Sequence, residues 1–526
     1  MLAQGPARFE RGGIEYAHWL DGDGYVTALT LDGAMAPTWG GRYVRTDAYD
    51  AEEESNAVLM RTTFGTQKPG GLLANALDIR LKSPANTNVL SVGDRLYALW
   101  EAGPPYEIDA STLACKGASD LGGRLRLSTA HGALPGTSGY DVADRALEAL
   151  GLLTDALSAH PREDSSDPSA TIAWSWRQRL VGDPAIEIAL HRLAHDGPAA
   201  SPVLPVRSTL EGVAFAPHDM ALSYSYALFV ASPTRVDILP FIAGVRGPAQ
   251  CTIFDTDKTL PASASSQIFL VPRRADGGEL SGEQPAVCAP IGAPYHPVHS
   301  ANAWDVDEPD GGDLRRVTLL VSCWPPEAVR RLARAGSSLL GSWEDLLSGD
   351  FSGVPNTNLC RFVVDVSSGS VVEHSILADG CQFDHPKVHP RWAARRSRFV
   401  FGTLGRRDNG GDEDATPCPP QSFGVIDADA DGGRGALIDS WAAGARRLVD
   451  EATLVPMAVG ADGVDSSDER AVWLVAPIFD GSAHTSTYVI LDGRKLAEGP
   501  VCEIALPGEA FIPWALHGCW RDAHDS

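Results

Sequence analysis

The chain has 526 residues, 44% of them hydrophobic, and its 43 basic and 68 acidic residues give a formal net charge of −25. This acidic balance argues against nucleic acid as a partner, because phosphates require basic stripes, and against a polybasic membrane patch. The sequence holds no uncharged apolar run of about 18 residues and no secretory signal pattern, so we expect neither a membrane span nor secretion. Nine dispersed cysteines without a C-x-x-C pair favour reduced thiols in a cytosol-like compartment.

Short alternating segments joined by turn residues are the dominant pattern along the chain, and each pair predicts a β-hairpin. The clearest pairs are, in order, 172–176 with 186–190, 361–366 with 371–373, and 471–475 with 487–491. Many such hairpins in a chain of this length predict an all-β fold, either a barrel, a sandwich or a propeller. No strict internal repeat selects among these three architectures.

Two segments show the 3.6-residue spacing of amphipathic helices, Asp144 to Leu157 and Pro326 to Leu347, and we place both between strands. The second carries a set of apolar residues that could form an exposed surface: Leu339, Leu340, Trp343, Leu346 and Leu347. The stretch 408–420 is rich in Gly, Asp and Pro and predicts an exposed loop.

Four histidines stand out among the 14 in the chain because each lies in a distinctive short string. The strings are Ala159-His160-Pro161, His218-Asp219-Met220, His299-Ser300-Ala301-Asn302-Ala303 and His517-Gly518. No helix or hairpin can bring such distant positions together, whereas a closed architecture with a central axis can. Four neutral imidazoles meeting at one point would bind iron, copper, nickel or zinc in preference to calcium or magnesium.

Other candidates for chemistry have a simpler interpretation. His191 and His195 have the spacing of a helical metal pair, but their segment predicts a strand, so we expect both on the surface. The segment Pro161 to Asp164 is expected to be a solvated loop. His385 and His296 are expected to lie near the four-histidine site without being ligands.

The four histidine strings resemble, in the same order, the iron-binding strings of the carotenoid cleavage oxygenases. Further motifs extend the resemblance over most of the chain: His18-Trp19-Leu20-Asp21-Gly22-Asp23-Gly24, Arg42-Tyr43-Val44-Arg45-Thr46, Asn86-Thr87-Asn88-Val89 and Leu96-Tyr97-Ala98-Leu99-Trp100-Glu101. The segment from Phe229 to Cys251 is most similar to the branch that cleaves apocarotenoids. The resemblance implies a seven-bladed β-propeller, with long loops and a few helices forming a cap over the iron face. We expect residues 1–526 to form one such domain, in which the family's leading segment is shortened.

The resemblance also implies a ligand set and its supporting residues. One Fe(II) per chain would be held by His160, His218, His299 and His517. Outer carboxylates that orient the histidine rings would be Glu101, Asp384 and Glu451. Asp384 replaces the usual glutamate and has a shorter reach, so we expect a water between it and His299. Thr87 matches a threonine beside the open iron position; alternatively, it is only a β-branched strand residue.

By this resemblance the protein would be a non-haem Fe(II) dioxygenase that uses O2 to cleave a conjugated C=C bond of a carotenoid or apocarotenoid into two carbonyl products. The alternatives within the family are cleavage of a stilbene-type substrate and isomerisation of a polyene without cleavage. The alternative from another class is a propeller scaffold without enzymatic activity.

An insoluble polyene requires an apolar tunnel whose entrance can contact lipid. The apolar run 236–245 is the candidate for that entrance, with Ile238, Leu239, Phe241 and Ile242 as its membrane-facing residues; alternatively, it is a buried strand. We therefore expect weak peripheral contact with a membrane. The expected location is the cytoplasm or the plastid stroma.

Overall fold

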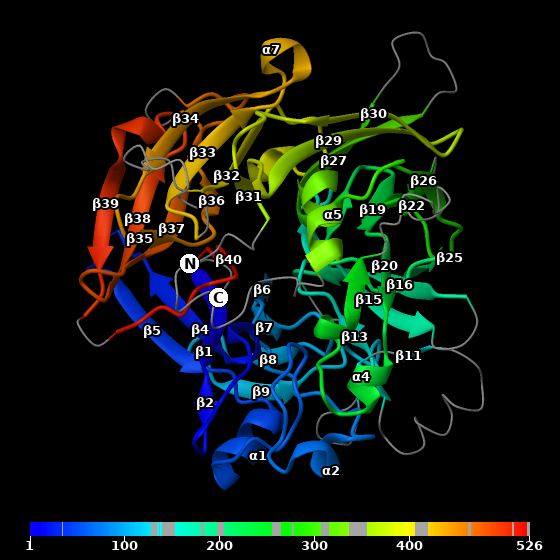
Figure 1. Cartoon of the computed structure of the whole chain (residues 1–526). Coiled ribbons are helices and arrows are strands. Elements are labelled where there is room, and N and C mark those ends of the chain that lie inside the picture. Colours follow the sequence, from blue (N-terminus) through cyan, green and yellow to red (C-terminus); the bar gives the residue numbers. More distant parts are fainter. Residues whose placement is uncertain are drawn as a thin grey trace.

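In the computed structural model, seven β-sheets are arranged around a central axis as a seven-bladed β-propeller (Figure 1). The structure describes residues 1–33, 35–127, 134–135, 137–138, 153–179, 183–196, 205–254, 265–275, 278–306, 315–335, 355–405, 419–460, 464–507 and 510–522. The prediction of an all-β fold is confirmed, and so is the choice of a propeller that the family resemblance implied.

Each blade is a sheet of mostly antiparallel strands that follow one another along the chain. The first blade contains β1 (Leu2–Arg8), β4 (Asp23–Thr30), β5 (Thr38–Tyr43) and β40 (His517–Cys519), and the second contains β6 (Asn88–Val92), β7 (Arg95–Leu99), β8 (Tyr106–Ile108) and β9 (Cys115–Ala118). The third blade contains β11 (Thr137–Ser138), β13 (Ala156–Leu157), β14 (Arg162–Glu163), β15 (Ala170–Arg179), β16 (Ala185–Ala194), β17 (Val206–Glu211) and β25 (Gly282–Glu283). The fourth blade contains β18 (Met220–Leu222), β19 (Tyr226–Ala231), β22 (Gln267–Pro272) and β26 (Val287–Pro290). The last three contain β27 (His296–Val306), β28 (Arg316–Trp324), β29 (Asn358–Asp365) and β30 (Ser370–Ile376); β31 (Phe383–Lys387), β32 (Phe399–Leu404), β33 (Ser422–Asp427) and β34 (Ala436–Ala442); and β35 (Arg447–Val449), β36 (Thr453–Pro456), β37 (Val472–Asp480), β38 (Thr485–Asp492) and β39 (Pro500–Ala505).

Shorter elements lie in the connections between these strands. They are the strand pairs β2 (Glu10–Arg11) with β3 (Ile14–Glu15), β10 (Leu134–Pro135) with β12 (Leu153–Thr154), β20 (Thr234–Val236) with β21 (Thr252–Phe254) and β23 (Arg274–Ala275) with β24 (Gly278–Glu279); the α-helices α1 (Asp47–Ser55), α2 (Gly71–Asn75), α4 (Leu239–Ile242), α5 (Pro326–Ala335) and α7 (Ala430–Gly433); and the 3-10 helices η1 (Trp19–Asp21), η2 (Ala249–Cys251), η4 (Pro390–Trp392) and η6 (Leu496–Glu498). Among the described residues, no helix has the length and apolar character needed to cross a membrane.

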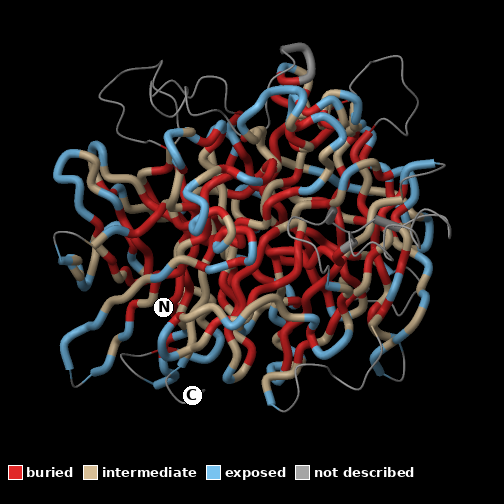
Figure 2. The backbone as a smooth tube through the Cα atoms, turned by 90° about the horizontal axis from the view of Figure 1, so that it is seen from below, coloured by how far each residue is buried: buried red, intermediate tan, exposed pale blue. Residues whose placement is uncertain are grey.

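The hydrophobic core lies between neighbouring blades, because both faces of an inner sheet are covered. Every residue of β19 is buried, and so is every residue of β28 after its first. The sequences of such strands are mostly apolar on both faces, since neither face is in contact with water. One core cluster joins Leu228 and Ile268 of one blade to Leu319 and Phe362 of the next. Figure 2 accordingly shows buried residues within the ring and exposed residues on the outer turns.

The ring closes through its two ends. Strand β40, near the end of the chain, pairs antiparallel with β1, and Gln4 lies opposite His517 in that ladder. The Gln4 side chain is itself buried and contacts the carbonyl of Ala85 ahead of β6. One blade therefore combines the first and the last strands of the propeller, as Figure 1 shows where blue and red ribbons meet.

The predicted hairpins are confirmed, since their segments lie in β15–β16, β29–β30 and β37–β38. The predicted helix at 326–347 is confirmed over Pro326–Ala335; its remainder, with the apolar residues 339–347, lies outside the described residues. The predicted helix at 144–157 is wrong at its end, where residues 153–154 and 156–157 form β12 and β13. The loop expected at 408–420 also falls almost entirely outside the described residues.

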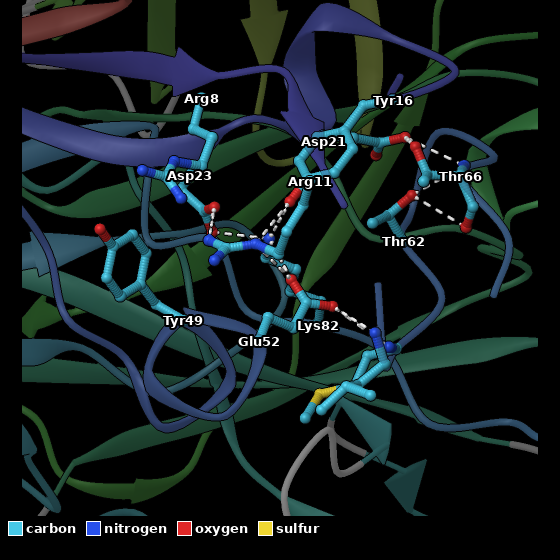
Figure 3. Close-up of polar contacts among 12 residues, drawn as sticks. Arg8, Arg11, Tyr16, Asp21, Asp23, Tyr49, Glu52, Thr62, Thr66 and Lys82 are labelled. Atoms are coloured by element: carbon cyan, nitrogen blue, oxygen red, sulfur yellow. Dashed lines mark hydrogen bonds and ion pairs between the residues drawn. The ribbon is translucent and has the colours of Figure 1, made fainter. Parts of the chain in front are cut away.

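A buried network of charged residues joins the N-terminal segments to the stretch that leads into the second blade (Figure 3). Lys82 lies 2.6 Å from Asp23 and 2.9 Å from Glu52, and Arg11 lies 2.9 Å from Asp23. All four side chains are almost completely buried. The Lys82 ammonium also donates to the Tyr16 hydroxyl over 3.0 Å. Two cations and two anions balance each other, which is the arrangement that buried charges require.

Candidate metal centre

The four histidines singled out in the sequence converge at the centre of the ring. One ligand atom each from His160, His218 and His299 lies within 4.8 Å of the other two. The ring centroid of His517 is 4.7 Å from that of His160 and 5.0 Å from that of His299. His160 precedes β14, His218 precedes β18, His299 lies on β27 and His517 begins β40, so four different blades contribute.

The protonation states of three of these histidines favour metal binding. Burial lowers the pKa of His160 and of His218 to about 3, and that of His517 to about 4. The three rings are therefore neutral near pH 7, which leaves a nitrogen lone pair on each available for a metal ion. Burial acts in the same direction on His299, but the adjacent Asp384 outweighs it and raises the pKa of His299.

Glu451 fixes the ring of His517. The Nδ1 atom of His517 lies 3.1 Å from Glu451 Oε1, and the amide of Gly518 donates to the other carboxylate oxygen over 3.1 Å. Lys387 contacts that same oxygen at 2.9 Å. Burial alone would raise the pKa of Glu451, but Lys387 and His517 hold it well below its usual range. An ionised Glu451 requires His517 Nδ1 to be the N–H donor, which turns Nε2 into a free acceptor.

Asp384 acts on His299 in the same way. The Nδ1 atom of His299 lies 2.9 Å from Asp384 Oδ1, and the Ser322 hydroxyl donates to that oxygen over 2.7 Å. Burial opposes ionisation of Asp384, but His299 and Ser322 keep its pKa well below the usual range. The expected bridging water is wrong: strand β31 lies close enough to β27 for the shorter aspartate to reach His299 directly.

Glu101 lies between two of the rings. Its Oε1 is 3.1 Å from His160 Nε2, and its Oε2 is 3.7 Å from His218 Nδ1. Burial raises the pKa of Glu101 to about 7, despite the nearby imidazoles. Although His160 Nε2 and Glu101 Oε1 are only 3.1 Å apart, both atoms are buried and neither makes a hydrogen bond within the described part of the chain. A buried ring nitrogen without a partner carries a desolvation cost, which a metal ligated at that atom would relieve. The donor set therefore fits a metal ion.

Thr87 is buried immediately before β6, and its hydroxyl donates to the Asn86 side chain over 3.2 Å. The next residue, Asn88, donates its side-chain amide to the carbonyl of Ala159 over 2.7 Å. The Asn86 to Asn88 segment therefore fixes the backbone just before His160.

The segment expected at the tunnel entrance forms β20 and the short helix α4. Ile238 and Leu239 are exposed, and Ile242 is half-buried. The exposure expected of Phe241 is wrong, because this side chain is only 4% exposed. Its ring lies 4.4 Å from the Arg61 guanidinium and packs against Leu81.

Several site residues were not predicted from the sequence. Lys387 pairs with Glu451, and Ser322 supports Asp384. Arg162 was expected in a solvated loop but pairs with the buried Asp219. These side chains lie close to the motif residues in space, but no sequence motif identifies them. Their role depends on which blades become neighbours in the fold.

His385 lies beside the cluster, as expected. Its ring is stacked on that of His299 with centroids 4.8 Å apart, and is 5.8 Å from that of His517. His296 is separate from these rings and packs between Phe254 and Trp324.

The fold and the cluster define a β-propeller protein with a candidate metal centre on its axis. The family model described as retinal pigment epithelial membrane protein matches residues 1–522. Apocarotenoid-15,15'-oxygenase of Synechocystis is 30% identical over 523 residues, covering 99% of this chain and 89% of that protein. Resveratrol cleavage oxygenase 1 of Aspergillus fumigatus is 27% identical, covering 97% of this chain and 87% of that protein. The structure of cobalt-substituted Synechocystis ACO has a TM-score of 0.73 at 28% identity, covering 98% of this chain and 91% of that one.

The chain belongs to the retinal pigment epithelial membrane protein family, which includes the carotenoid cleavage oxygenases. The resemblance seen in the sequence is thereby confirmed. The protein is an enzyme of the oxygenase class, and the alternative of a scaffold without activity is wrong.

The contacts of Glu451 lead to a prediction. Glu451→Gln should lower metal affinity or turnover roughly 10- to 100-fold, the usual cost of losing an outer partner of a ligand. A neutral amide cannot hold both the His517 N–H and the Lys387 ammonium as strongly. Metal content and steady-state turnover measure the effect. Glu498→Gln, which alters an exposed glutamate paired only with Lys495 among the described ion pairs, is the control. Identical behaviour of the two variants would contradict an orienting role for Glu451.

Proposed function

We propose that the protein binds one Fe(II) through His160, His218, His299 and His517, and uses O2 to cleave a conjugated C=C bond of an apocarotenoid. The single observation that carries this proposal is the convergence of four buried or half-buried imidazoles from four blades. The 30% identity with the Synechocystis apocarotenoid-15,15'-oxygenase supports the substrate class.

The chain's own residues supply the geometry of this centre. Neutral nitrogen ligands suit ferrous iron, and four of them leave up to two positions open in an octahedral ion. Iron in such a site would supply the redox-active centre that dioxygen chemistry needs. Glu451 and Asp384 hold His517 and His299 with Nδ1 as the donor, so that Nε2 can face the metal. Thr87 is proposed to lie beside an open position.

An exposed apolar surface is proposed to contact the membrane that holds the substrate. Leu73, Leu77 and Leu239 are 99%, 79% and 70% exposed. Helices α2 and α4 are adjacent, because the amide of Leu77 donates to the carbonyl of Ile242 over 2.8 Å. We name the exposed apolar residues of these two segments the α2–α4 patch: Leu72, Leu73, Leu77, Ile238, Leu239 and Val245. Contiguous apolar surface of this kind marks membrane or partner contact. We propose that the protein lies at the periphery of a membrane, in the cytoplasm or plastid stroma.

Replacing Leu73 and Leu239 with serine should reduce binding to liposomes and turnover of lipid-borne substrate, while metal content stays unchanged. Binding should depend only weakly on salt, since a chain of net charge −25 is not attracted to anionic lipid. Liposome co-sedimentation measures the effect. Val372→Ser, at an exposed apolar residue on β30, is the control. Equal sedimentation of parent and double variant would exclude the α2–α4 patch as the contact.

The proposed reaction is tested by product analysis under labelled dioxygen. Iron-loaded protein is incubated with an apocarotenoid, a carotenoid and a stilbene, and the carbonyl products are examined for label. Labelled aldehydes from the apocarotenoid are expected. Preference for the stilbene would favour the specificity named in the Aspergillus relative. Isomerised substrate without cleavage, or cleavage without dioxygen, would refute the proposed reaction.

A further inference from the structure

Beside the histidine cluster lies an ion pair that the proposed function does not use. Arg162 begins β14, two residues after His160, and Asp219 directly follows His218. Arg162 Nε donates to the carbonyl of Met220 over 2.7 Å, and a terminal nitrogen of the same guanidinium pairs with the Asp219 carboxylate. The Asp219 side chain is 3% exposed, so this contact is buried on the carboxylate side.

The Asp219 carboxylate also reaches a third blade. Its Oδ2 accepts the backbone N–H of Ser300 over 2.7 Å, and Ser300 directly follows His299. Its Oδ1 accepts the N–H of Met220 over 2.6 Å. One carboxylate thus contacts segments that adjoin three of the four histidines.

These contacts of Arg162 and Asp219, which we call the Arg162–Asp219 bridge, connect strands that are not connected within any one sheet. Strands β14, β18 and β27 belong to three separate sheets, so no β-ladder fixes their relative positions. A metal site needs its ligands held within about 0.5 Å of the productive geometry. The planar guanidinium uses two nitrogens on two acceptors, which fixes direction as well as distance. Because the pair of Arg162 and Asp219 is neutral, it provides geometry rather than charge.

We propose that Asp219 and Arg162 are positioning residues that hold His160, His218 and His299 in their mutual arrangement before the metal binds. The proposal rests on the metal centre proposed above. His517 lies outside this bridge and is oriented separately by Glu451.

Cobalt(II) binding to metal-free protein tests the bridge, because the visible spectrum of cobalt reports ligand geometry independently of turnover. Asp219→Asn should bind cobalt roughly 10- to 100-fold more weakly, in the range of other outer-partner losses, and with an altered spectrum. Arg162→Lys should shift both readouts in the same direction, since an ammonium lacks the planar fork. Arg162→Lys retains the charge, so it also tests the bridge if Asp219→Asn fails to fold. Asp427, at the end of β33, pairs with Arg398 away from the cluster, so Asp427→Asn should change neither readout.

The double variant Asp219→Ala with Arg162→Met separates positioning from general stability. Removing both charges should return the thermal midpoint toward the parent value, whereas cobalt affinity should remain low. Recovery of parental affinity in the double variant would overturn the bridge, as would a parental affinity and spectrum in Asp219→Asn. Failure of the parent itself to bind cobalt would instead refute the metal centre, and the bridge with it.

Discussion

The His299→Ala protein is expected to lose most of its iron and its measurable turnover. Removing this ring takes away one of the four proposed ligands and leaves Asp384 without its imidazole partner. Three neutral nitrogens remain, from His160, His218 and His517. The loss should exceed the roughly 10- to 100-fold effect of losing an outer partner. Metal analysis of the purified protein, followed by turnover after reconstitution with Fe(II), measures both quantities.

The matched control for this experiment is His191→Ala. His191 is also buried, but it lies on β16 and its Nε2 is 2.8 Å from the Ser175 hydroxyl. The control should retain iron even if its stability falls. Full iron content and turnover in His299→Ala would contradict the ligand assignment.

The Lys82→Met protein is expected to be about 3–5 kcal/mol less stable to unfolding, because removing one partner leaves buried charges uncompensated. Asp23 and Glu52 would lose the ammonium that lies within 2.9 Å of each. Denaturant unfolding of the parent and the variant measures this difference through the midpoint and the slope.

Lys116→Met is the control for the buried network. Lys116 is 50% exposed and pairs with Glu107 over 3.2 Å. An exposed pair of this kind contributes about 0–1 kcal/mol, so the control should unfold close to the parent. Equal midpoints for Lys82→Met and Lys116→Met would show that the four charges of the network are not strongly coupled.

The sequence indicated the four histidines and the three carboxylates beside them, but not the residues that pair with Glu451 and Asp219, for a physical reason. Each histidine lies in a local string, so His160, His218, His299 and His517 could be chosen without knowing the fold. The pairs Lys387–Glu451 and Arg162–Asp219 join segments far apart in the chain, and they exist only once the blades are neighbours. Reading Arg162 as a solvated charge was therefore the reasonable local interpretation, and tertiary packing overrides it.

The fold, like the site, could be predicted from the sequence where the signal is local and not where it depends on tertiary packing. Alternating segments such as 172–176 predicted hairpins correctly, because the alternation of apolar and polar residues is a local property of a strand. The number of blades came only from the family resemblance, since no internal repeat is visible. His191, expected on the surface, is buried because its face of β16 packs against the second blade. Leu193, on the same face, clusters there with Leu90 and Tyr97. Likewise, Phe241 belongs to an apolar run, but its ring packs inward against Leu81 and Trp100, beside the Arg61 guanidinium.

The pairing of β40 with β1 also has a consequence for the order of events during synthesis. Translation produces the segments carrying the first three histidines of the proposed centre well before β40, so a nascent chain lacks the fourth proposed ligand. The fourth arrives with the strand that joins the last blade to the first. Completion of the proposed centre and closure of the propeller would thus coincide late in synthesis, and a ribosome-bound chain halted before β40 would have neither.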